Sequence, residues 1–169
     1  MAELVPAPFQ DLVTRLHREP EVQGSVFGLP QRRWYQPDRA GPDLSVTFYG
    51  RRAGTPVGPA AGPHTQMAQN MLLSYAAGGR ILELKTVQAN DRLTIPRPCI
   101  DMANVGYNVE WSQELSIDES ACEYVAGAML IEMFRHSAWG VAAGQDGAAG
   151  DAMDRHRDLG RGAGFPAHQ

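Results

Sequence analysis

The stretch that most constrains the fold runs from residue 54 to residue 101. It begins with a short apolar segment (55–61), continues as an apolar helical pattern (63–77) and, after a glycine pair, ends in a second apolar segment (80–85). This order predicts a strand, a helix and a second strand, because glycine at a helix end favours a stop. The carboxyl ends of two such strands lie at the same edge of a parallel sheet, where α/β proteins bind their ligands. We therefore expect the functional site at that edge.

Length and charge restrict the class of protein. A chain of 169 residues, 43% of them hydrophobic, is long enough for one domain. The net charge is -4, and Lys and Arg occur as singles and pairs, so we expect no nucleic-acid partner. No apolar run approaches the roughly 20 residues of a membrane-spanning helix, and no basic segment followed by an apolar core starts the sequence. We expect a cytoplasmic protein that does not bind membranes.

Cysteine and histidine spacing predicts no metal site. Cys99 and Cys122 lie in no CxxC or Cys/His ligand pattern, and His136, His156 and His168 share no helix face. Two thiols in a reducing compartment seldom pair, so we expect both cysteines to be buried and free.

The residues before the central stretch predict a structural cap. Apolar residues recur at helical spacing over residues 8–17, and apolar and polar residues alternate over 44–49. We predict a helix and a strand there, with a turn at residues 50–54. In a barrel, such segments commonly cover the bottom, so we assign residues 1–53 to a helix and strand cap.

Two features of the central stretch suggest a ligand. The segment TPVGPAAG is built from residues too small to shield the backbone, so a flat ligand can lie directly on it. It lacks the Lys and hydroxyl of a phosphate loop. Lys85 lies at the end of the second predicted strand, with Glu83 two residues earlier. Lys85 either pairs with Glu83 or reaches solvent, or it meets an anionic ligand.

The chain after residue 86 combines a long loop, a helix and a small-residue tail. The loop carries Asn104 and Asn108, whose amides suit either a planar ligand or turn formation. Ser116 and Glu119 form a capping-box pattern, followed by a core-facing apolar stripe (Cys122, Val125, Ala126, Met129, Leu130, Met133 and Phe134). Residues 137–169 are rich in Ala and Gly, which predicts a mobile tail.

Three blocks carry a resemblance to a known family. TPVGPAAG, GGRILELKTVQ and RPCIDMANVGYNVEWSQEL resemble the opening of the dihydroorotate-dehydrogenase-like FMN barrels. The similarity covers about residues 1–135 and is closest to flavoproteins assigned as selenate reductase subunits, which resemble the glutamate-synthase-type electron-transfer enzymes. The resemblance implies an α/β (β/α)8 TIM barrel that binds FMN and transfers electrons, with iron-sulfur modules in the full-length relatives.

The same resemblance implies roles for individual residues. Ala60, Ala61 and Gly62 would lie beside the isoalloxazine ring, and Lys85 would bind near flavin N1 and O2 with Thr86 beside it. A substrate-holding Asn would be Asn108 or Asn104, and the GYN context favours Asn108.

The chain also departs from the family pattern. A complete barrel needs about 250 residues and binds the FMN phosphate on loops after its seventh and eighth strands, and no iron-sulfur cysteine cluster or GxGxxG motif is present. We therefore expect an incomplete barrel over residues 54–136, the N-terminal fragment of a flavin-dependent oxidoreductase that is inactive alone. The alternatives are a non-catalytic module that binds other redox subunits or its own copies, and a truncated product without a function. The small-molecule substrate stays open.

Overall fold

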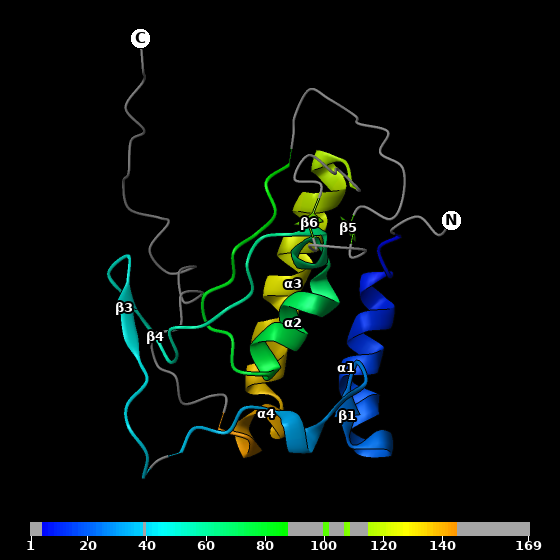
Figure 1. The fold of residues 1–169 in the computed structure, drawn as a ribbon. Helices are drawn as coiled ribbons and strands as arrows, with labels where there is room; N and C mark the ends of the chain where they lie inside the picture. The colour runs from blue at the N-terminus through cyan, green and yellow to red at the C-terminus, as the bar shows by residue number, and fades with distance from the viewer. Residues whose placement is uncertain (1–4, 39, 88–99, 102–106, 109–114, 145–169) are drawn as a thin grey trace, which may run out of the picture.

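The computed structural model describes residues 5–38, 40–87, 100–101, 107–108 and 115–144. Four α-helices, two short 3-10 helices and three two-stranded antiparallel sheets are found in these ranges (Figure 1). In chain order they are α1 (Phe9–Gln23), β1 (Ser25–Val26), β2 (Leu29–Pro30), η1 (Gln31–Arg33), β3 (Val46–Phe48), β4 (Arg51–Ala53), η2 (Pro63–Gln66), α2 (Ala68–Ala76), β5 (Ile100–Asp101), β6 (Tyr107–Asn108), α3 (Ile117–His136) and α4 (Ala138–Ala142).

The predicted N-terminal helix is present and longer than expected. Helix α1 continues through Pro20 to Gln23 and ends at Gly24, whose φ of 60° is the left-handed conformation that glycine adopts at low cost. Leu12 and Leu16 are buried, as their spacing predicted. The helix therefore docks its apolar stripe on the core.

The core lies between α1, α2 and α3, which run alongside one another in Figure 1. Leu72, Leu130 and Phe134 are fully buried, and Trp34 packs edge-on against Phe134 with ring centroids 5.1 Å apart. A Cβ at Gly127 would lie 2.5 Å from Met71 Sδ, so a residue without a side chain lets α2 and α3 approach closely.

The predicted core face of the last long helix is partly wrong. Its capping box is present, with Ser116 Oγ accepting from Glu119 N and Glu119 Oε2 accepting from Ser116 N. However, Cys122, Val125 and Met129 are exposed, so the expected buried thiol is also wrong for Cys122. The buried stripe of α3 consists of Ser120, Glu123, Gly127, Leu130, Ile131, Phe134 and Arg135. The pattern of apolar residues misplaced this stripe, because it takes no account of the buried carboxyl of Glu123 or of the close contact at Gly127.

The two central segments predicted as strands run side by side but do not form a regular ladder. Arg80 N and Ile81 N donate to Val57 O at 2.9 and 3.3 Å, and Glu83 N donates to Pro59 O at 3.3 Å. Donor and acceptor positions both increase along the chain, so the two segments are parallel. The ladder is incomplete because proline at position 59 has no N–H to donate to Ile81 O. The predicted helix also begins late: η2 precedes α2, and Met67 between them is extended.

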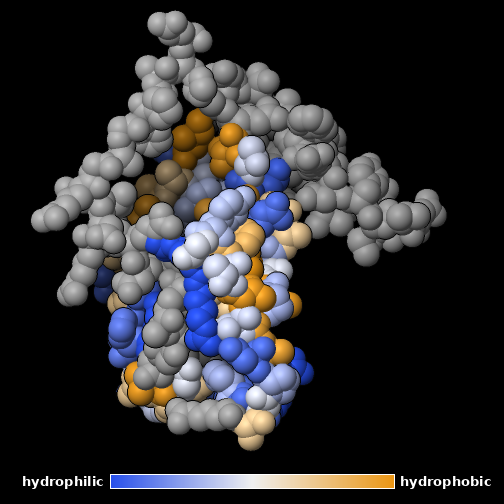
Figure 2. Space-filling model, turned by 90° about the vertical axis from the view of Figure 1, so that its left-hand side faces the viewer, coloured by the Kyte–Doolittle hydropathy of each residue, from blue (hydrophilic) through white to orange (hydrophobic). Residues whose placement is uncertain are grey.

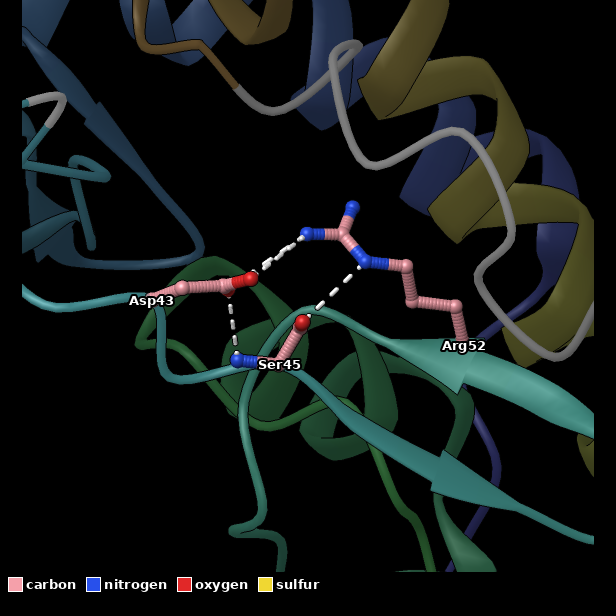
Figure 3. A network of polar contacts seen from close by, with 3 residues as sticks. All are labelled: Asp43, Ser45 and Arg52. Atoms are coloured by element: carbon pink, nitrogen blue, oxygen red, sulfur yellow. Dashed lines mark hydrogen bonds and ion pairs between the residues drawn. The ribbon is translucent and has the colours of Figure 1, made fainter.

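A hairpin occupies the predicted strand and turn before the central stretch. Strand β3 pairs with β4 around Tyr49 and Gly50, which have φ values of 48° and 74°. At its base Arg52 Nη2 lies 3.4 Å from the Asp43 carboxylate and Arg52 Nε donates to Ser45 Oγ at 3.1 Å (Figure 3). The backbone N–H of Ser45, together with its hydroxyl and Arg52, holds the pKa of Asp43 below its usual value.

Part of the predicted loop and tail lies outside the described residues. Of residues 88–114, the structure describes only the pair of β5 and β6, in which Ile100 lies opposite Asn108. Within the predicted tail, residues 138–142 form α4, and residues 145–169 are not described.

Candidate functional site

The predicted site lies where the two parallel central segments end. Ala60 is exposed, Ala61 is half-buried and Gly62 is buried at the end of the first segment. Lys85 is buried and Thr86 exposed at the end of the second. The structure thus places these five residues at the ends of two neighbouring segments.

A carboxylate joins the two ends. Glu83 Oε2 accepts a hydrogen bond from Ala61 N at 2.9 Å. Within the described residues no ion pair links Glu83 to Lys85, so Glu83 holds the backbone of the small-residue segment instead of the neighbouring lysine. The prediction that Lys85 reaches solvent is also excluded, because only 9% of the residue is accessible.

A tight turn fixes the backbone of Gly62. Thr65 Oγ1 donates to Gly62 O at 2.9 Å and accepts from Gly62 N at 3.2 Å. Thr65 is 3% exposed, so this pair of bonds is shielded from water. The turn places η2 immediately after the small-residue segment.

Helix α3 is hydrogen-bonded to the second central segment and to the start of α2. Tyr124 Oη donates to Lys85 O at 2.6 Å, and Glu123 Oε2 accepts from Ala68 N, the first residue of α2, at 2.7 Å. A carboxylate at a helix N-terminus satisfies a free backbone N–H and complements the helix dipole. Burial raises the pKa of Glu123, an effect that its hydrogen bond from Ala68 partly offsets, and burial also raises the pKa of Tyr124.

An unpartnered amide lies in the turn that follows Gly62. Gln66 is completely buried, and neither its side-chain nitrogen nor its side-chain oxygen has a hydrogen-bond partner. Ser120 Oγ on α3 is likewise buried and without a partner. Leaving a buried polar group unsatisfied costs about 1–3 kcal/mol, so such groups call for an explanation.

Three residues of the site were not predicted from the sequence: Gln66, Glu123 and Tyr124. Gln66 follows Gly62 by four residues, at the start of the predicted helix (63–77), and its closeness to the small-residue segment was the available signal. Glu123 and Tyr124 carry no such signal, because their partners are backbone groups far away in the sequence. Of the two predicted substrate residues, Asn108 lies in β6 and Asn104 falls outside the described residues.

A separate apolar pocket of about 240 Å³ lies between the hairpin, the second central segment, α2 and α3. None of the predicted site residues lines it. Hydrophobic residues also reach the surface beside hydrophilic ones on the hairpin side of the molecule (Figure 2). The pocket is lined by Phe48, Arg51, Ala53, Met71, Tyr75, Arg80, Ile81, Leu82, Leu84, Ile131, Glu132 and Arg135.

The described part of the chain contains no group of three or more His, Cys, Asp or Glu residues that could hold a metal ion. In the same residues, no helix has the length and hydrophobicity needed to cross a membrane.

Comparison with known proteins identifies relatives of the chain. Residues 27–147 match the family described as "Oxidoreductase YgfK, N-terminal TIM-barrel domain". "Putative oxidoreductase YgfK" from Escherichia coli K12 and from E. coli O157:H7 are each 46% identical over 128 residues. The alignment covers 76% of this chain and 12% of each relative. No solved structure matches. The α/β TIM-barrel class and the oxidoreductase family are thereby confirmed, whereas the incompleteness of the barrel stays a prediction.

Proposed function

This chain belongs to the family of N-terminal TIM-barrel domains of the oxidoreductase YgfK, and from that membership we propose that it forms part of an FMN-dependent oxidoreductase. The flavin ring would lie on Ala60, Ala61 and Gly62, with Lys85 and Thr86 at its edge. The observation that supports the proposal is that hydrogen bonds hold the backbone of both segments. Ala61 N donates to the Glu83 carboxylate, and Tyr124 Oη donates to the backbone carbonyl of Lys85. A preorganised site of this kind costs little to order when a rigid ligand binds.

The residues present fit a flavin in charge and hydrogen bonding. Lys85 is a buried cation at the end of the second segment, and a reduced flavin carries negative charge at N1 and O2. The side-chain amide of Gln66 has a donor nitrogen and an acceptor oxygen without partners. These two groups would complement the alternating acceptor and donor groups on the pyrimidine edge of the flavin ring. Bound FMN would supply the electron-transfer chemistry.

The chain's own residues would position the ring and tune its charge. The small side chains of Ala60 and Ala61 let a planar ligand approach the backbone, while the Gly62–Thr65 turn keeps that backbone from shifting. The positive charge of Lys85 would favour the reduced, anionic state of the ring, because opposite charges at close range stabilise each other. The resemblance to selenate reductase subunits makes an oxyanion the first acceptor to test in longer relatives.

The test is a fluorescence titration of the full chain with FMN and with riboflavin. The two should bind with similar affinity, because the proposed contacts involve only the ring. Lys85→Met should weaken binding at least about tenfold, roughly 1.4 kcal/mol. Arg32→Met, which removes an exposed positive charge elsewhere, is the matched control and should bind like the unmodified chain.

Two outcomes contradict the proposal. In the first, neither FMN nor riboflavin binds to the chain at any concentration up to its solubility limit, and neither binds to a chimera in which the chain replaces the aligned segment of the E. coli K12 relative. Alternatively, Lys85→Met and Arg32→Met would bind equally well, and Lys85 would then have only a structural role.

A further inference from the structure

Tyr124 joins the end of the second central segment to helix α3. Its Oη donates to the backbone carbonyl of Lys85 at 2.6 Å, although the two residues are 39 positions apart in the sequence. This distance is at the short end of the usual range for O–H···O hydrogen bonds. Burial raises the pKa of Tyr124, so the phenol keeps its proton at neutral pH and stays a donor. The bond therefore holds this point of the segment against α3.

The bond acts on two predicted cofactor residues at once. The carbonyl that accepts it belongs to the planar peptide unit joining Lys85 to Thr86. Lys85 is 9% exposed, and a side chain packed among other atoms has few alternative rotamers. The position of its ammonium group therefore follows the position of its backbone.

The pairing of the two central segments constrains this end less strongly. Glu83 N donates to Pro59 O at 3.3 Å, longer than the roughly 2.9–3.0 Å that is typical of N–H···O bonds. The turn of α3 that carries Tyr124 is itself held in place, because the preceding residue, Glu123, accepts from Ala68 N at 2.7 Å. Helix α3 thus gives the end of the segment a firmer reference point than the neighbouring segment does.

We propose that Tyr124 is a positioning residue, which holds Lys85 where its ammonium group meets the pyrimidine edge of the flavin and so raises the reduction potential of the ring. This inference rests on the proposed function. The oxidised ring is neutral and the reduced ring carries negative charge near N1 and O2, so a well-placed cation stabilises the reduced ring more. Without the Tyr124 hydroxyl, Lys85 keeps its charge and loses its position. The loss should therefore fall mainly on binding of the reduced ring.

The test compares the reduction potential of riboflavin free in solution and bound to the full chain, measured against a reference dye without oxygen. The difference gives the ratio of the affinities for reduced and oxidised riboflavin. In Tyr124→Phe this ratio should fall about tenfold, which is about 30 mV for a two-electron couple. The affinity for oxidised riboflavin should change by less than about threefold.

Thr55→Val is the matched control for the loss of a hydroxyl. Thr55 Oγ1 donates to Gly78 O at 2.7 Å and Thr55 is 3% exposed, so this variant also loses a bond from a side-chain hydroxyl to a backbone carbonyl. Both variants should lose some stability towards urea, because each loses one hydrogen bond. Only Tyr124→Phe should lower the affinity ratio.

A double-mutant cycle tests whether Tyr124 acts through Lys85. In the Lys85→Met background, Tyr124→Phe should leave the affinity ratio unchanged, because the ammonium group is already absent. A measurement without flavin supports the cycle: the carbonyl carbon-13 shift of Lys85 should move in Tyr124→Phe and stay in place in Thr55→Val. Should Tyr124→Phe fail to fold, the same quantities are measured in the chimera described above.

Three results would overturn the inference while riboflavin still binds. These are an unchanged affinity ratio in Tyr124→Phe, an equal fall in Thr55→Val, and a further fall when Tyr124→Phe is added to Lys85→Met. Tyr124 would then only join α3 to the segment, and the proposed function would stand. If riboflavin binds neither the chain nor the chimera, the proposed function fails and this inference fails with it.

Discussion

At the scale of single residues, Gly58 determines how closely the two central segments approach. A Cβ at this position would lie 1.5 Å from the carbonyl oxygen of Ile81, a backbone atom that cannot move aside like the end of a side chain. Glycine is therefore required by contact and not by its φ angle. The small residues of this segment predicted a ligand, and the structure adds a packing role for Gly58.

We expect Gly58→Ala to lower the free energy of unfolding by about 3 kcal/mol, the upper end of typical overpacking costs. Chemical denaturation measures this change. Ala60→Ser, two residues away and exposed, should stay within about 0.5 kcal/mol of the original chain. Equal stability of the two variants would mean that the segments are farther apart than described.

Gln66 should show opposite effects on stability and on ligand binding. Gln66→Met keeps an unbranched side chain and removes two unsatisfied buried atoms, so the free energy of unfolding should rise by about 1 kcal/mol. If the amide binds the pyrimidine edge, riboflavin affinity should fall about tenfold in the same variant. Ser120→Ala, which also removes an unpartnered buried oxygen, should leave the affinity unchanged. A Gln66→Met variant that binds riboflavin as tightly as the original chain excludes this role.

At the scale of elements, α3 connects the other parts of the candidate site. Its Glu123 bonds to the start of α2, and the adjacent Tyr124 bonds to the end of the second central segment. The capping box at Ser116 and the length of the helix were predictable from sequence, because both depend on neighbouring residues. The buried face was not, since it is set by contacts with α2 at Glu123 and Gly127.

The raised pKa of Glu123 gives a testable pH dependence. Its folded-state pKa lies above the value of 4.5 for an unperturbed carboxyl, so the folded state binds more protons between these values. The stability contribution of Glu123 therefore falls as pH rises from about 4.5 through the folded-state pKa. Glu123→Gln, which can still accept from Ala68, should be more stable than the original chain at pH 7.

Urea denaturation at pH 4 and pH 7 checks this expectation. The stability gain of Glu123→Gln should be present at pH 7 and nearly absent at pH 4, where both side chains are neutral. The exposed carboxyl of Glu21 on α1 provides the control variant Glu21→Gln. A gain that is the same at both pH values would mean that burial of the Glu123 charge is not its cause.

At the scale of the whole molecule, the sequence predicted the α/β class, the three longest helices and the order of the central unit, but not α4, which lies in the predicted mobile tail. It did not predict that the two parallel segments would lack a regular ladder, because that depends on Pro59 facing Ile81 across the pair. The five predicted cofactor residues do lie at the ends of these two neighbouring segments. Their connections through Glu83 and α3 could not be predicted, since both involve tertiary hydrogen bonds.

The central claim is that a flavin ring binds at the ends of these two segments. The most direct measurement is an NMR titration of the isotope-labelled full chain with riboflavin. We predict that the largest shifts occur at Ala61, Gly62 and Lys85, with little change at Met71 and Ile131 in the apolar pocket. Shifts confined to the pocket, or no shifts at all, would contradict the account.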